Sequence, residues 1–258
     1  MELTLAGRTY VVMGVANHRS IAWGIAQALD KAGARLVFTY NNDRFREPVE
    51  KLAATLSGKG SLFYACDVTS DEEITAAFAA IQADAGVIHG VAHCIAFAKK
   101  EELDGDYMNT TRDGFLLAQN ISAYSLTAVL KAARPLMSEG GSVVTMTYLG
   151  GERVVKNYNV MGVAKASLDA SVKYLASDLG KDNIRVNAIS AGPVRTLSAK
   201  GIAEFNSVLK VIEEKAPLRR SISPEDVGNA AVFLFSDLSK NITGETLHVD
   251  AGYNIISI

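Results

Sequence analysis

Short apolar runs alternate with longer stretches in which apolar residues recur every three or four positions. The runs are rich in β-branched residues and predict strands at 9–13, 35–40, 62–66, 90–95, 142–147, 185–190 and 247–250. The stretches between them predict helices, among them one long helix over 111–137. This alternation predicts an α/β fold. We expect one Rossmann-like, doubly wound domain over residues 1–258, with a parallel sheet of about seven strands and helices on both faces.

Composition narrows the class of protein further. The chain has 258 residues, 48% of them hydrophobic, which suits one large core better than two small ones. The net charge of −2 and the lack of a basic tract give no support for a nucleic-acid partner. No apolar run reaches about 18 residues, so no membrane span is expected. The N-terminus does not resemble a signal peptide.

The cysteines and histidines argue against two further classes. Cys66 and Cys94 both lie in apolar, strand-like contexts, so a disulfide framework is not expected and a reducing, cytoplasmic location is. The four histidines are scattered without metal-ligand spacing, and we expect no metal site.

A glycine-containing turn follows the first strand. Gly14 ends the strand, and Ser20 precedes an amphipathic helix that begins at Ile21. Such a turn offers backbone N–H groups and a helix N-terminus to an anion such as a cofactor pyrophosphate. The spacing departs from G-x-G-x-x-G, because Ser20 stands where a middle glycine is expected. The alternative is an ordinary turn in which Ser20 caps the helix.

The ends of the second and third strands carry polar residues. Asn41 and Asn42 follow the second strand, where an acid suits a free ribose 2′-hydroxyl and a basic residue suits a 2′-phosphate. Two neutral amides favour NADH over NADPH. Asp67 and Val68 follow the third strand, where the carboxylate suits the adenine amino group; the alternative is that Asp67 caps the next helix.

Two tyrosines and a lysine stand around the end of the fifth strand. Tyr158 and Lys165 are seven residues apart and therefore share one helix face, and Tyr148 precedes them. An ammonium beside a phenol favours the phenolate, so we expect Lys165 to lower the pKa of Tyr158. The alternative is a half-buried tyrosine and a solvated lysine on an ordinary helix.

Two further segments matter for a ligand. Residues 191–198 follow the sixth strand with a Gly-Pro turn, and Thr196 there suits a nicotinamide amide or a phosphate. Residues 195–210 are rich in small residues and predict a mobile lid, the alternative being an ordinary surface helix. Residues 101–109 are polar and predict a loop.

Together these motifs resemble the short-chain dehydrogenase/reductase superfamily and, within it, the NADH-type enoyl-acyl-carrier-protein reductases of bacterial fatty acid synthesis. General members of the superfamily place a serine before the catalytic tyrosine and use Y-x3-K. This chain has Tyr148 ten residues before Tyr158, and then Y-x6-K up to Lys165. That spacing is typical of the enoyl reductase branch, and the resemblance covers nearly the whole chain.

The resemblance implies roles for individual residues. Tyr158 would hydrogen-bond the thioester carbonyl and stabilise the enolate, Lys165 would hold the nicotinamide ribose, and Tyr148 would line the substrate pocket as part of the active site. Some NADPH-preferring relatives carry a basic pair where this chain has Asn41 and Asn42. The implied cofactor contacts are Gly14, Ser20, Ile21, Asn41, Asp67, Val68, Ile95, Lys165, Val194, Arg195, Thr196, Leu197 and Ser198. The implied substrate contacts are Ala98, Tyr148, Tyr158, Met161 and Phe205.

The resemblance also implies partners. The substrate would arrive on acidic acyl carrier protein, with Lys200, Lys210, Arg219 and Arg220 as a candidate docking patch. The chain would form a homotetramer. Two other functions are alternatives: a 3-oxoacyl or carbonyl reductase of the same superfamily, and a non-catalytic dinucleotide-binding regulator. The Y-x6-K spacing argues against the first, and the intact trio of Tyr148, Tyr158 and Lys165 argues against the second.

Overall fold

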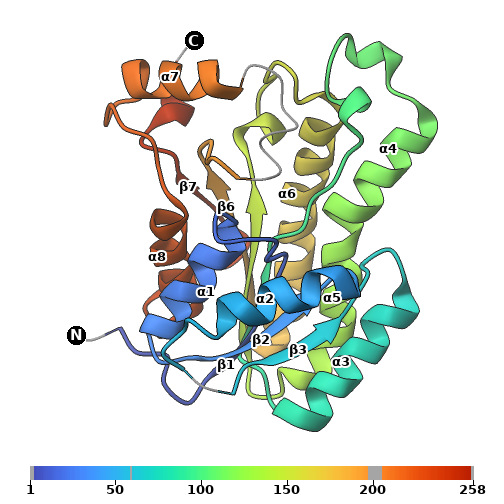
Figure 1. Cartoon of the computed structure of the whole chain (residues 1–258), viewed down its shortest axis with the longest axis vertical. Helices are drawn as coiled ribbons and strands as arrows, with labels where there is room; N and C mark the ends of the chain where they lie inside the picture. The colour runs from blue at the N-terminus through green and yellow to red at the C-terminus, as the bar shows by residue number, and fades with distance from the viewer. Residues whose placement is uncertain (1–2, 59, 197–204, 257–258) are drawn as a thin grey trace.

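A single parallel sheet forms the centre of the computed structural model, which describes residues 3–58, 60–196 and 205–256 (Figure 1). Its seven strands lie in the order β3-β2-β1-β4-β5-β6-β7, and every adjacent pair is parallel. The strands are β1 (Thr9–Met13), β2 (Arg35–Tyr40), β3 (Leu62–Ala65), β4 (Gly90–His93), β5 (Gly141–Thr147), β6 (Ile184–Ala191) and β7 (Thr246–Val249). The predicted doubly wound sheet is therefore confirmed.

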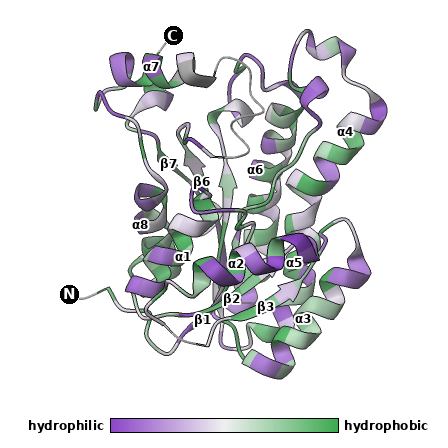
Figure 2. Cartoon of the chain, in the orientation of Figure 1, coloured by the Kyte–Doolittle hydropathy of each residue, from purple (hydrophilic) through white to green (hydrophobic). Residues whose placement is uncertain are grey.

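Helices cover both faces of this sheet (Figure 1). They are α1 (Ile21–Lys31), α2 (Arg46–Ala53), α3 (Asp71–Ala85), α4 (Arg112–Gln119), α5 (Ser125–Ala133), α6 (Asn159–Leu179), α7 (Phe205–Lys215) and α8 (Pro224–Phe235). Helices α1, α2 and α8 pack on one face, and α3, α5 and α6 on the other. Helix α2 turns a strongly hydrophilic side outward (Figure 2).

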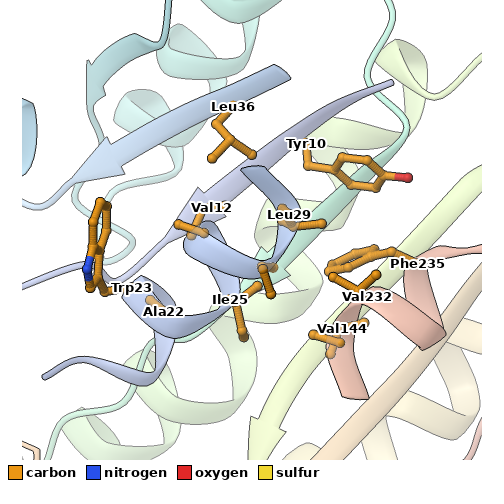
Figure 3. Packing of buried hydrophobic residues seen from close by; sticks show 14 of the residues in the cluster. Tyr10, Val12, Ala22, Trp23, Ile25, Leu29, Leu36, Val144, Val232 and Phe235 are labelled. Atoms are coloured by element: carbon orange, nitrogen blue, oxygen red, sulfur yellow. The ribbon is translucent and has the colours of Figure 1, made fainter. Parts of the chain in front are cut away.

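Alternate residues of each strand feed the two hydrophobic layers. In β1, Val12 faces the layer of α1 and α8, whereas Val11 faces the layer of α3, α5 and α6. Figure 3 shows Val12 and Leu36 facing Ile25 and Leu29 of α1. Strands that are buried on both faces read as continuous apolar runs, which explains why the strands could be recognised in the sequence.

Caps fix where several helices begin. The Ser70 hydroxyl accepts the Glu73 N–H at the start of α3, at 3.1 Å. Ser223 and Asp226 form a reciprocal capping box at the start of α8, with Pro224 in the first turn. Among the described residues, no helix is both long and apolar enough to cross a membrane.

Two elements differ from the prediction by more than one residue at an end. The strand expected over 90–95 ends at His93, because the chain leaves the sheet there to line a cavity. The single helix expected over 111–137 is wrong in detail: a π turn at Asn120–Tyr124 separates α4 from α5, and a 3-10 turn follows α5. A π turn leaves the apolar stripe of a helix almost unchanged, so periodicity did not reveal it.

Candidate active site

A cavity of about 450 Å³ opens at the carboxyl ends of β1, β4, β5 and β6. The strand order reverses between β1 and β4, which is where open α/β sheets bind their ligands. Eleven of the predicted site residues line it: Gly14, Ser20, Ile21, Ile95, Ala98, Tyr148, Tyr158, Met161, Lys165, Val194 and Thr196. The structure thus brings together segments that lie far apart in the sequence.

Close backbone approach explains the glycines of the first turn. Gly14 has φ of +91°, and a Cβ there would lie 2.1 Å from the Cys94 carbonyl oxygen. Gly24 lets α1 pack against the start of α8, since its Cβ would lie 2.3 Å from the Pro224 carbonyl oxygen. Gly14 thus meets the demand of a tight dinucleotide turn, and Gly24 allows close packing between two helices.

Ser20 is turned toward the glycine turn rather than toward its helix. Its Oγ accepts the backbone N–H groups of Ala16 at 3.1 Å and Asn17 at 3.0 Å, and it makes no side-chain cap bond to α1. Ser20 therefore occupies the N-cap position of α1, but its side chain does not cap the helix. With two amides on its oxygen, the hydroxyl keeps its own proton for donation into the cavity. A buried hydroxyl beside a helix N-terminus fits a phosphate oxygen.

Tyr148, Tyr158 and Lys165 meet at the end of β5. The rings of the two tyrosines lie edge to face, with centroids 4.9 Å apart and an interplanar angle of 72°. Gly150 leaves space for this contact, because a Cβ there would lie 2.4 Å from the Tyr158 ring. Lys165 is only 5% exposed, and its Nζ donates to the Met146 carbonyl at 2.7 Å. The alternative of a solvated lysine is therefore wrong.

Burial shifts the pKa values of Tyr148, Tyr158 and Lys165. It raises the pKa of Tyr158 well above its usual value, and Tyr148 and Asp169 add to the effect. Burial also raises the pKa of Tyr148. It lowers the pKa of Lys165 to about 8, against an opposing contribution from Asp169. The expectation that Lys165 would lower the pKa of Tyr158 is wrong, because desolvation, Tyr148 and Asp169 all raise it. Tyr158 is a neutral phenol and a hydrogen-bond donor.

Several expected cofactor residues lie at the same edge of the sheet but do not line the cavity: Asn41, Asp67, Val68 and Arg195. Asp67 accepts the backbone N–H and the hydroxyl of Thr69, at 2.9 and 2.8 Å. Because Ser70 caps α3, the alternative role of Asp67 as that cap is wrong. Asn41 is exposed at the end of β2.

Part of the predicted lid over 195–210 falls outside the described residues. Leu197 and Ser198 lie there, as does Lys200 of the candidate docking patch. Phe205 begins α7, which runs on to Lys215, but its side chain is not among those described.

Sequence reasoning missed part of the cavity lining. Lys100 and Leu103 come from the segment after β4, and Val155 and Lys156 come from the loop before α6. Lys100 and Leu103 could have been predicted from the sequence. Loops that follow the carboxyl ends of parallel strands line the ligand crevice, and these two residues follow β4. Residues 101–109 were interpreted only as a polar loop. Among the described residues, no group of three or more histidine, cysteine or acidic side chains is arranged to hold a metal ion.

Comparison with known proteins places this geometry in context. A family model described as Enoyl-(Acyl carrier protein) reductase matches residues 14–254. The chain is 69% identical to the enoyl-acyl-carrier-protein reductase (NADH) FabI of Bacillus subtilis, over 99% of both chains. It is 59% identical to the NADPH enzyme of Staphylococcus aureus MRSA252, over 98% of this chain and 99% of that one. The crystal structure of the Bacillus cereus reductase, with NADP+ and an indole naphthyridinone, superposes with a TM-score of 0.98, at 65% identity and full coverage of both chains.

Proposed function

Because the chain belongs to the enoyl-acyl-carrier-protein reductase family, we propose that it reduces the carbon–carbon double bond of trans-2-enoyl thioesters carried on acyl carrier protein, with NADH, in fatty acid elongation. The observation that carries this proposal is the half-buried, protonated phenol of Tyr158. It lies in one cavity with Tyr148 and the Lys165 ammonium, beside the glycine turn.

The residues around the cavity fit a dinucleotide. Gly14, Ser20 and Ile21 would hold the pyrophosphate, through backbone N–H groups and the free hydroxyl proton of Ser20. Lys165 would contact the ribose next to the nicotinamide, and Ile95 would lie against one of the two riboses. NADH supplies the hydride when bound. Further contacts along the same edge belong to this proposal: Asn41, Asp67, Val68, Val194, Arg195, Thr196, Leu197 and Ser198.

Tyr158 performs the polarisation. Its hydroxyl donates to the thioester carbonyl oxygen, where negative charge builds up as the β carbon is reduced. A donor aimed at that oxygen stabilises the transition state more than the ground state, and burial strengthens the bond. The raised pKa keeps the proton on Tyr158, so the enolate is held by a hydrogen bond until its α carbon is protonated.

Lys165 and Tyr148 support this donor. At neutral pH Lys165 remains largely protonated, because its pKa of about 8 lies above 7. Its bond to the Met146 carbonyl fixes the ammonium within the cavity. The Tyr148 ring packs edge to face on Tyr158 and restricts its rotation. Ala98 and Met161 line the side where the acyl chain would lie.

The choice of NADH rests on the residues after β2. Asn41 and Asn42 are neutral, and the nearest cations have other contacts: Arg44 lies over the Phe45 ring, and Arg46 pairs with Glu50 at 2.8 Å. A 2′-phosphate therefore meets no preformed basic pair there. The Staphylococcus aureus relative at 59% identity is an NADPH enzyme, so the test compares both cofactors.

We also propose that the chain works as a homotetramer in the cytoplasm and receives its substrate from acyl carrier protein. Exposed apolar side chains support assembly, among them Leu116, Tyr174 and Ile255. Arg220 and the exposed Lys210 are candidate contacts for the acidic carrier. Sedimentation velocity tests the tetramer, and a single monomeric species would contradict it.

The decisive test is NADH oxidation with trans-2-butenoyl thioester, followed at the nicotinamide absorbance. We expect turnover with this substrate, and little with a 3-oxobutanoyl thioester. Turnover of the 3-oxo substrate alone would make the chain a carbonyl reductase. Binding of NADH without turnover of either substrate would make it a dinucleotide-binding regulator.

A further inference from the structure

The segment between β4 and α4 forms one wall of the cavity. We call residues 96–103 the outer wall. Ala96, Phe97, Ala98, Lys100 and Leu103 of this segment line the cavity, on the side where the acyl chain would lie. The outer wall is not part of the sheet, and its backbone forms short local turns. Something other than a strand ladder must therefore fix its position.

Ser122 fixes one end of the outer wall. This serine is fully buried, and its Oγ accepts the Phe97 N–H at 3.0 Å and donates to the Phe97 carbonyl at 3.1 Å. One hydroxyl thus holds both main-chain groups of Phe97. Ser122 belongs to the π turn between α4 and α5, whose extra residue changes the direction of the side chains that follow. Its neighbour Ser125 holds the ring of His93, the last residue of β4, at 2.9 Å.

Glu102 fixes the other end. Its carboxylate is 5% exposed and accepts both the backbone N–H of Thr111, at 3.1 Å, and the Thr111 hydroxyl. Thr111 in turn caps α4 by accepting the Gly114 N–H at 3.0 Å. Gly114 leaves the space that Glu102 occupies, since a Cβ there would lie 2.1 Å from Oε1. The outer wall is therefore bound to the first turn of α4.

Between these two ends, the outer wall packs against the catalytic helix. Leu103 lies in a small apolar cluster with Val160 and Met161 of α6, and Ala98 and Tyr158 pack against the same cluster. A shift of the outer wall would therefore move the surface on which the acyl chain lies beside Tyr158.

We propose that Ser122 and Glu102 are positioning residues for the enoyl substrate, which hold the outer wall at both ends. This inference rests on the proposed function. Neither residue lines the cavity. Removing either one loosens ground-state and transition-state binding alike, which raises KM and leaves kcat nearly unchanged. The glycine turn is a separate segment, so NADH binding does not change.

The test compares Ser122→Ala and Glu102→Ala with two matched controls. Glu102→Gln keeps an acceptor for the Thr111 N–H and offers a donor to its hydroxyl oxygen, so it restores wild-type behaviour. Ser142→Ala removes another buried serine, whose hydroxyl donates to the Leu234 carbonyl at 2.7 Å far from the cavity. In Ser122→Ala and in Glu102→Ala we expect KM for trans-2-butenoyl thioester to rise about tenfold. We expect kcat and the Kd for NADH to change by less than about twofold.

A second readout follows the outer wall itself. Lys99 and Lys100 lie within it, so limited trypsin digestion with mass spectrometry measures how often this segment opens. We expect trypsin to cut this segment faster in Ser122→Ala and Glu102→Ala than in the wild type. Glu102→Gln and Ser142→Ala should be cut at the wild-type rate. If Ser122→Ala fails to fold, Ser122→Cys replaces it, and if Glu102→Ala fails to fold, Glu102→Asp replaces it. In both replacements we again expect a higher KM and faster cleavage.

The outcomes separate this inference from the proposed function. If the wild type does not reduce the enoyl thioester, the proposed function fails and this inference fails with it. If the wild type is active but the alanine variants match Ser142→Ala in KM, only the inference is overturned. The same conclusion follows if Glu102→Gln behaves like Glu102→Ala.

Discussion

The hydroxyl of Tyr158 is the group on which the chemistry rests. Tyr158→Phe keeps the ring and its contact with Tyr148 but removes the donor. We expect kcat with an enoyl thioester to fall roughly 100- to 1,000-fold, the usual effect of losing one oxyanion donor. The Kd for NADH remains within about twofold, since the cofactor turn is untouched.

A matched tyrosine gives the control for this prediction. Tyr64 donates its hydroxyl to Asp84 at 2.7 Å and does not line the cavity. Tyr64→Phe therefore removes a hydrogen-bonded phenol without affecting the reaction. Equal losses of activity in the two variants would mean that Tyr158 acts through stability rather than as a donor.

The charge of Lys165 sets a pH limit on activity. Burial lowers its pKa to about 8, so the ammonium is lost as the pH rises above that value. We expect kcat/KM to fall across a limb centred near pH 8, because a neutral amine holds the ribose hydroxyls less strongly. A pH profile measures this limb, and Lys165→Arg should move it beyond the accessible range. An unchanged limb in that variant would assign it to another group.

The lowered pKa of Lys165 changes stability with pH in the opposite direction to activity. The unfolded lysine titrates near its ordinary value of 10.5, so between pH 8 and 10.5 the unfolded chain binds more protons than the folded chain. The burial of Lys165 therefore costs stability below pH 8, and this cost is relieved as the pH rises toward 10.5. Between pH 8 and 10.5, kcat/KM therefore falls while the contribution of Lys165 to the free energy of unfolding becomes more favourable.

At the scale of elements, the junction of β2 and α2 sets the cofactor preference. Asn41→Arg with Asn42→Lys adds a basic pair where a ribose 2′-phosphate would lie, and charge-assisted bonds to phosphate are strong. We expect the ratio of kcat/KM for NADPH over NADH to rise roughly 10- to 100-fold. Initial rates with both cofactors on one enoyl thioester measure this ratio.

The control adds a cation elsewhere. Gln82→Arg places it on the exposed side of α3, near the helix end that lies at the opposite edge of the sheet. This variant should leave the cofactor ratio unchanged. If it raises the ratio as much as the double variant, the effect is one of overall charge.

Elements also show how far the sequence could be interpreted. The central strands were predictable because they are buried on both faces, as Val11 and Val12 of β1 show. The start of α8 was predictable from Ser223, Pro224 and Asp226, which act locally. The raised pKa of Tyr158 could not be predicted from the sequence, because its desolvation comes from chain segments that only the fold brings together. The burial of Glu102 in a polar segment escaped notice for the same reason, since Gly114 leaves its space from twelve residues away.

At the scale of the whole molecule, the cofactor should act as part of the folded structure. The cavity draws residues from the segments after β1, β4, β5 and β6, so the complete site exists only in the native state. A ligand that binds only the native state raises the free energy of unfolding by about 2.7 kcal/mol at 100 times its Kd. In a chain of this size, that corresponds to a rise in Tm of roughly 5 to 10 °C.

This linkage turns thermal unfolding into a measure of cofactor choice that does not depend on turnover. At equal concentrations NADH should raise Tm more than NADPH, because the end of β2 offers neutral amides rather than a basic pair. In Asn41→Arg with Asn42→Lys the order should reverse, whereas Tyr158→Phe should keep the wild-type order. Equal shifts for both cofactors in the wild type would show that the end of β2 does not discriminate. The preference would then have to arise elsewhere along the adenosine end, where Asp67 and Val68 follow β3.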